Sequence, residues 1–156
     1  MGDTGYFEML GRLALALVLG GLLGAQREAL RKPAGLKTHM MVSLGAASFT
    51  LVTLHLFARL DGSGPSFRSD PLRIVEGVIG GIGFLGAGTI IQARGSVRGI
   101  TTAATIWVVG AVGVACGGGE FELAGTVAGL AFLILTVIGN IERRFHPRNG
   151  LEDPDS

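Results

Sequence analysis

Charged residues are scarce in this sequence of 156 residues, because Asp, Glu, Lys and Arg together make up only 16 % of it. Soluble domains carry roughly 25 % charged residues, so the composition argues against a cytosolic protein. The few charges fall at intervals and leave apolar runs that can cross about 30 Å of hydrocarbon at about 1.5 Å per helical residue. The sequence therefore predicts an all-α, polytopic membrane protein.

Cysteine is almost missing, and so is any excess of charge. Cys116 is the sole cysteine, which excludes an intramolecular disulfide and a multi-cysteine metal site within one chain. The net charge is only +1, so no nucleic-acid partner is indicated. No nucleophile and base are spaced for catalysis, and we expect a non-enzymatic protein without a cofactor.

Five apolar segments are predicted to cross the membrane as one bundle, with connections that contain Gly or Pro. They are Tyr6–Ala25, Thr38–Ala58, Ile74–Gln92, Ile100–Cys116 and Phe121–Ile141. Residues 1–141 then form a single membrane domain. Residues 142–156 form a short polar tail that we expect to be disordered.

The basic residues predict the orientation, because Lys and Arg near span ends are retained on the cytoplasmic side. With the N-terminus outside, nine of them fall inside: Arg27, Arg31, Lys32, Lys37, Arg94, Arg98, Arg143, Arg144 and Arg148. Four fall outside: Arg12, Arg59, Arg68 and Arg73. We therefore expect a periplasmic N-terminus and a cytoplasmic C-terminus in a bacterial inner membrane, where membrane lipids are partners.

Glycine is abundant, with 27 residues that lie mostly inside the apolar runs. Glycine lets helix backbones approach closely within a membrane. We expect the glycines of the third span either to pack closely against the face of Gly20 and Gly24 or to unwind the helix and line a cavity. The residues concerned are Gly20, Gly24, Gly81, Gly83, Gly86 and Gly88. Exposed glycine faces also make a homodimer a candidate assembly.

The first two spans also resemble the next two, at offsets of 60 to 64 residues. Val18-Leu19-Gly20-Gly21 matches Val78-Ile79-Gly80-Gly81, and Gly35-Leu36-Lys37-Thr38 matches Gly99-Ile100-Thr101-Thr102. Two interpretations are open: a parallel repeat of helices 1-2 and 3-4, or chance similarity in Gly-rich sequence.

Polar residues gather at the cytoplasmic span ends, in a set that we call the vestibule. It comprises Arg27, Glu28, Lys32, Thr38, Arg98, Thr101, Thr102 and Thr105. The second and fourth helices begin there, so their free N–H groups and positive dipole ends, together with Arg27 and Arg98, suit an anionic group. The alternative is that the threonines cap helices and the basic residues set the orientation.

Three stretches together resemble the MgtC/SapB family of bacterial inner-membrane proteins. They are Gly20 to Glu28 followed by Lys32 to His39, Gly81 to Ile91, and Val97 to Trp107. The resemblance implies a five-helix membrane domain with the N-terminus outside, and links to magnesium limitation and to intracellular survival in pathogenic members. It also implies inhibition of the ATP synthase in one branch, where Thr101 here replaces an Asn. Many members carry a cytoplasmic C-terminal domain, which we do not expect here.

The function that we expect is regulation of membrane machinery, either the ATP synthase or another membrane transporter, in magnesium homeostasis or stress survival. Mg²⁺ needs hard oxygen ligands, usually carboxylates. Glu8, Glu28 and Glu76 fall near span ends, so no metal ligands are assigned and Mg²⁺ transport by one chain is disfavoured. A small oligomeric transporter or channel, with solute passing between the two proposed repeats, is the alternative, and backbone carbonyls in an oligomer could line such a pore.

Overall fold

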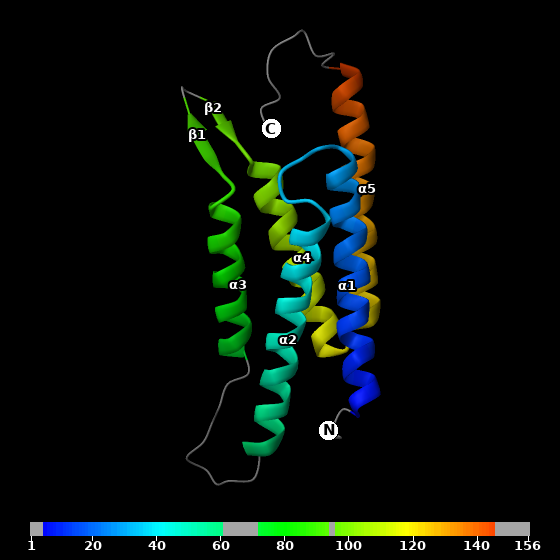
Figure 1. Ribbon diagram of the computed structural model, residues 1–156, viewed down its shortest axis with the longest axis vertical. Coiled ribbons are helices and arrows are strands. Elements are labelled where there is room, and N and C mark those ends of the chain that lie inside the picture. The colour runs from blue at the N-terminus through cyan, green and yellow to red at the C-terminus, as the bar shows by residue number, and fades with distance from the viewer. Residues whose placement is uncertain (1–4, 61–71, 94–95, 146–156) are drawn as a thin grey trace.

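Five helices and one short hairpin account for the residues that the computed structural model describes, which are 5–60, 72–93 and 96–145 (Figure 1). In chain order the elements are α1 (Tyr6–Ala29), α2 (Leu36–Leu60), α3 (Leu72–Ala87), β1 (Ile91–Ala93), β2 (Ser96–Arg98), α4 (Ile100–Gly118) and α5 (Phe121–Phe145). The helices run alternately up and down the long axis of the molecule. The predicted five-helix bundle is confirmed.

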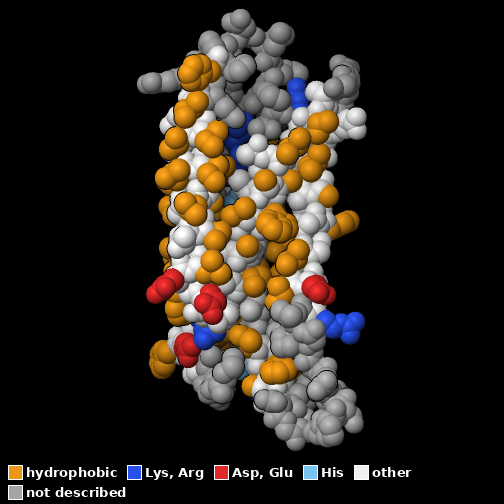
Figure 2. Space-filling view, turned by 180° about the vertical axis from the view of Figure 1, so that it is seen from behind, with side chains coloured by type: hydrophobic (Ala, Val, Ile, Leu, Met, Phe, Trp, Pro, Cys, Tyr) orange, Lys and Arg blue, Asp and Glu red, His pale blue; other side chains and the backbone are white. Residues whose placement is uncertain are grey.

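The surface of the bundle suits a bilayer. The helices α1, α2, α4 and α5 are each long and apolar enough to cross a membrane, whereas α3 is a shorter apolar helix of 16 residues. Figure 2 shows hydrophobic side chains over the middle of one face and acidic side chains gathered toward one end. The chain is therefore a membrane protein with an apolar girdle.

The third span ends earlier than predicted. The expected helix ran to Gln92, but α3 ends at Ala87 and the chain then turns into the antiparallel hairpin of β1 and β2. Thr89 closes the turn, because its hydroxyl donates a hydrogen bond of 2.7 Å to the carbonyl of Gly86. Residues 89–91 are apolar or β-branched and favour strand over helix, so hydropathy overestimated the span.

Two other boundaries also move. Helix α1 continues beyond the predicted end at Ala25 to Ala29, which makes Arg27 and Glu28 helical. Helix α5 runs to Phe145, so the first residues of the predicted tail are helical, and the rest of that tail, 146–156, lies outside the described residues.

Glycine and alanine bring α1, α2 and α4 into close contact at the centre. A Cβ atom added at Gly20 would lie 2.7 Å from the Ser43 Cβ, and one added at Gly24 would lie 2.8 Å from the His39 Cβ. A Cβ added at Gly117 of α4 would lie 2.6 Å from the carbonyl oxygen of Ala47. No side chain fits at these three positions, so the centre of the bundle is closed.

The helix contacts have the symmetry of a parallel repeat. The contact between α1 and α2 corresponds to the contact between α3 and α4. The contact between α1 and α4 likewise corresponds to the contact between α3 and α2, and α2 packs on α4 at the centre. One aligned contact also recurs. Gly24 meets His39, and its counterpart Gly86 meets Ala103, at sequence offsets of 62 and 64 residues. This pattern of contacts is the one expected of a parallel repeat, whose pseudo-twofold axis would run along the bundle between α2 and α4.

The glycines of α3 pack differently from those of α1. Packing of the third span against Gly20 and Gly24 was expected, but those glycines contact α2. A Cβ atom added at Gly81 or Gly83 would meet nothing within 4 Å, and the expectation is wrong for these two residues. Helix α3 is continuous through them, so the cavity-lining alternative of an unwound segment is wrong as well.

Candidate functional site

The end of the bundle where α1 ends and α2 and α4 begin holds the predicted vestibule, and we call it the rim end. Arg27 lies at its centre and is only 3 % exposed. Its guanidinium donates hydrogen bonds to the Thr102 hydroxyl on α4 and, at 3.5 Å, to the carbonyl of Pro33 in the α1–α2 loop. Arg27 therefore joins three segments of the chain from beneath the surface.

Glu28, the next residue, caps the N-terminus of the neighbouring helix α2. Its carboxylate accepts a hydrogen bond of 2.8 Å from the backbone N–H of Leu36, the first residue of α2. An acidic group at a helix N-terminus also complements the helix dipole. The sequence suggested threonines as caps, but α2 begins at Leu36, before Thr38, and α4 begins after Gly99, whose φ is +87°.

The vestibule residues divide into a buried set and a surface set. Arg27, Thr102 and Thr105 are buried, whereas Glu28, Thr38 and Thr101 are exposed. Lys32 and Arg98 are half-buried, and Arg98 lies on strand β2 of the hairpin. The structure thus brings these residues to one end of the bundle, with a hydrogen-bonded interior and a polar outer layer.

His39 also belongs to the buried set. It is fully buried, and its Nδ1 lies 3.0 Å from the carbonyl oxygen of Gly35. That carbonyl can only accept, so Nδ1 carries the proton and Nε2 of a neutral ring is an acceptor. Nε2 and the hydroxyl of the equally buried Ser43 have no hydrogen-bond partner among the described residues. Hydropathy gives no signal for this burial.

A second arginine of α1 binds α4 at the opposite end. The guanidinium of Arg12 donates a hydrogen bond of 2.8 Å to the carbonyl of Gly117 and another of 2.5 Å to the carboxylate of Glu8. Cations stabilise the C-terminal ends of helices, where carbonyl groups are unsatisfied. Helix α1 is therefore tied to α4 near both of its ends.

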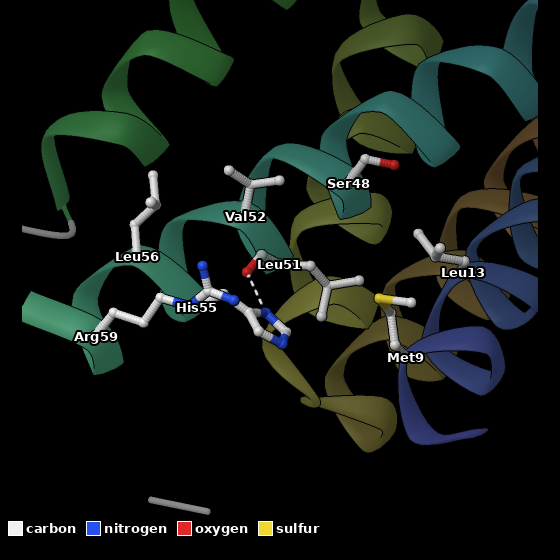
Figure 3. A pocket seen from close by; sticks show the side chains of 8 residues that line it. All are labelled: Met9, Leu13, Ser48, Leu51, Val52, His55, Leu56 and Arg59. Carbon is white, nitrogen blue, oxygen red and sulfur yellow. Dashed lines mark hydrogen bonds between the residues drawn. The ribbon is translucent and has the colours of Figure 1, made fainter. Parts of the chain in front are cut away.

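A hollow of about 440 Å³ lies between α1 and α2, away from the rim end (Figure 3). Its lining is mostly apolar, and the His55 ring bonds the Leu51 carbonyl at 2.9 Å. The lining residues are Met9, Leu13, Ser48, Leu51, Val52, His55, Leu56 and Arg59. None of them is a carboxylate, so the hollow offers no hard ligands for a cation.

Acidic groups stay on the outside of the described bundle. Glu8, Glu28, Glu76, Glu120 and Glu122 are all exposed, and within the described ranges no three His, Cys, Asp or Glu residues approach closely enough to hold a metal ion. The described interior therefore contains one buried cationic group, Arg27, several hydroxyls and His39, but no buried carboxylate.

Comparison with known proteins identifies the family. The model of the MgtC family matches residues 13–144, which run from within α1 to the last turn of α5. The chain belongs to the MgtC family. Among curated relatives of this MgtC-family chain, "Protein MgtC" of Salmonella typhimurium strain LT2 is 38 % identical over 135 residues, which cover 86 % of this chain and 52 % of the relative.

Two further relatives are similar over most of this chain. "Putative magnesium transporter YhiD" of Escherichia coli strain K12 is 37 % identical over 145 residues, which cover 91 % of this chain and 66 % of the relative. An uncharacterised protein of Haemophilus influenzae is 34 % identical and covers 86 % of this chain and 56 % of its own length. The chain thus spans about half to two thirds of these relatives. No solved structure matches it.

Proposed function

We propose that this chain is a non-enzymatic protein of the bacterial inner membrane that acts on other membrane machinery, the ATP synthase or an ion transporter, in magnesium homeostasis or stress survival. The observation that carries the proposal is the closed centre of the bundle. Gly20, Gly24 and Gly117 bring the helices too close for a solute path, and the described interior has no buried carboxylate. Action through the surface is then the simpler mechanism.

The orientation in the proposal rests on the basic residues. Arg27, Arg31, Lys32, Lys37 and Arg98 all lie at the rim end, and basic residues near span ends are retained in the cytoplasm. We therefore place the rim end in the cytoplasm and the N-terminus in the periplasm. The exposed part of the vestibule then faces cytoplasmic parts of membrane complexes.

The contact surface that we propose is this outer layer of the vestibule. Arg98 and Thr101 lie on either side of the turn into α4, and Lys32 and Thr38 flank the start of α2. Arg27 and Thr102 hold these two starts in position from within, and the exposed carboxylate of Glu28 bonds the start of α2. The arrangement suits an anionic group on a partner, such as a carboxylate, because cationic side chains and helix N-termini converge there.

A transporter is the second candidate, because the Escherichia coli relative is named as a putative magnesium transporter. An oligomer offers a path that a single chain does not, through backbone carbonyls between subunits. Solute flux through the purified protein distinguishes this candidate from the regulatory one.

The test combines two measurements on the full chain. In inverted inner-membrane vesicles, the chain is expected to lower the initial rate of ATP-driven acidification, measured with a pH-sensitive dye. Arg98→Ala at equal expression should restore the rate, whereas the control Arg59→Ala, at the opposite end, should not. Liposomes that contain the purified chain and a trapped Mg²⁺ indicator should admit no more Mg²⁺ than empty ones. Unchanged acidification together with Mg²⁺ entry would overturn the proposal in favour of transport.

A further inference from the structure

A twofold relation between the helix pairs α1–α2 and α3–α4 would leave one helix position of the bundle unfilled. Helix α5 packs on α1 and α4, and the symmetry that exchanges the two helix pairs carries this place to the edge between α3 and α2. No element of the described chain occupies that edge. We call it the α2–α3 edge and define it by Gly45 and Phe49 on α2 and Gly77, Gly80 and Phe84 on α3.

Matched residues show that one edge is covered and the other is bare. Leu23 and Leu85 occupy the same place in the motifs Gly-Leu-Leu-Gly-Ala and Gly-Phe-Leu-Gly-Ala, yet they are 1 % and 54 % exposed. On α4, Cys116 is fully buried in the cluster that includes Ala124 and Ala128 of α5. The repeat thus places similar residues where no fifth helix protects them.

The bare face of α3 is shaped for close helix contact. A Cβ atom added at Gly77, Gly80 or Gly81 would meet nothing within 4 Å, and because these glycines stand at i, i+3 and i+4 they form a shallow channel along one side of the helix. Glycine in a membrane helix gains little against lipid, but it permits a second helix backbone to approach closely. Phe84, 80 % exposed, projects beside the channel.

We propose that the α2–α3 edge binds the same edge of a second copy of the chain, so that α3 of each copy fills the unfilled helix position of the other. Two copies inserted in the same orientation are related by an axis along the membrane normal, and the two α3 helices are then parallel. This pairing is separate from the action on other membrane machinery, which we assign to the rim end.

The edge is complementary to itself in shape and in charge. Side chains on a helix lean toward its N-terminus, so Phe84 of one copy reaches the level of Gly80 and Gly81 in the parallel helix of the other. Arg73 and Glu76 are both exposed on α3 and lie about 4.5 Å apart along the helix axis. In the pair, Arg73 of each copy lies within reach of Glu76 of the other.

Cysteine cross-linking tests the geometry. In a Cys116→Ala chain, Gly80→Cys is expected to form an intermolecular disulfide in native membranes on mild oxidation. The matched control Gly129→Cys, on the outer face of α5 where an added Cβ also meets nothing within 4 Å, should remain monomeric. Cross-linking of the control instead of Gly80→Cys would overturn the proposal.

A charge exchange separates pairing from folding. The intact chain in mild detergent should be a dimer by native mass spectrometry, and Arg73→Glu should convert it to a folded monomer through repulsion from Glu76 of the other copy. The double variant Arg73→Glu, Glu76→Arg should restore the dimer. A wild-type chain that is monomeric in detergent and is not cross-linked at Gly80→Cys in membranes would overturn the proposal, as would dimers that are insensitive to Arg73→Glu.

Discussion

Helices α1 and α3 carry similar glycine motifs in different surroundings. Each carries a Gly-Gly pair followed by a Gly-Ala pair, at Gly20 and Gly24 in one and at Gly80 and Gly86 in the other. In α1 these glycines face α2 at distances that exclude a side chain, whereas Gly80 faces open space. Helix α1 also continues to Ala29 and carries Arg27, whereas α3 ends at Ala87.

The difference shows that a glycine motif permits close contact with another helix but does not determine whether another helix lies there. Close approach needs a second helix, and α1 has three neighbours, in α2, α4 and α5. Helix α3 has the same kind of face, yet this part of it has no neighbour among the described residues. In a bilayer, a second helix would gain more dispersion energy on such a face than lipid tails do, because lipid tails pack less closely against a glycine channel.

The largest expected effect comes from filling the two glycine positions with the same side chain. Gly20→Leu should destabilise the folded chain by about 3 kcal/mol or more, because its Cβ already lies too close to Ser43 and the carbonyl of His39. Gly80→Leu should leave the folded monomer within about 1 kcal/mol of wild type and abolish dimers. Detergent unfolding followed by circular dichroism measures the first, and native mass spectrometry the second. Equal destabilisation would remove the contrast between α1 and α3.

The second effect concerns the contribution of Arg27 to stability, since α1 carries this arginine and α3 has no equivalent. Arg27→Met should destabilise the chain by about 1.5 to 3 kcal/mol, because the buried Thr102 hydroxyl loses a charged donor. The control Lys37→Met, on the exposed side of α2, should change the stability by less than about 0.5 kcal/mol. In the double variant Arg27→Met, Thr102→Val, the loss should be smaller than the sum of the two single losses. Additive losses would mean that the two side chains do not act together.

The third effect compares the paired leucines of the repeat. Leu23→Ala should lower the stability by about 2 kcal/mol, because it leaves a cavity between packed helices. Leu85→Ala should change the stability of the monomer by less than about 0.5 kcal/mol, because that side chain is largely exposed. Unfolding of both variants in one detergent, below the concentration at which dimers form, makes the comparison. A larger loss of stability for Leu85→Ala than for Leu23→Ala would contradict the description of one edge as covered and the other as bare.

The smallest effect concerns the residues that precede α2 and α4. Gly99→Ala should cost about 1 to 2 kcal/mol, because φ at Gly99 is +87° and an added Cβ would collide with the Thr89 carbonyl. Gly35→Ala should cost less, because its added Cβ would meet chiefly the movable side chain of Glu28. Thermal unfolding of the two variants ranks them, and a reversed order would show that the two helix starts are not built as described.

Hydropathy was enough to predict the five helices, because each run of apolar residues is long and is bounded by charge or by Gly and Pro. It failed at the end of α3, since Ile90 and Ile91 are apolar without being helical. Three-residue strands such as β1 and β2 carry too few residues for a periodic signal. The sequence also predicted that the vestibule residues lie at one end of the bundle. This prediction was possible because alternating spans bring every second connection to the same side.

The buried contacts of the site could not be predicted from the sequence. Arg27 and Thr102 are separated by 75 residues, and nothing local marks one as the partner of the other. Burial of His39 depends on Gly20 and Gly24, which let α2 approach α1 so closely that the imidazole is covered. The sequence also offered threonine caps where the structure uses a glutamate from the preceding helix, a tertiary contact that overrides local preference.

The bond between Arg27 and Thr102 has a consequence for the way the chain enters the membrane. Thr102 is synthesised 75 residues after Arg27, so when α1 leaves the ribosome the hydroxyl that will accept from its guanidinium does not yet exist. A lone arginine is retained poorly by hydrocarbon. Arg27 lies in the last turn of α1, where its guanidinium can stay in interfacial water, and it becomes buried against Thr102 only when the fourth helix arrives.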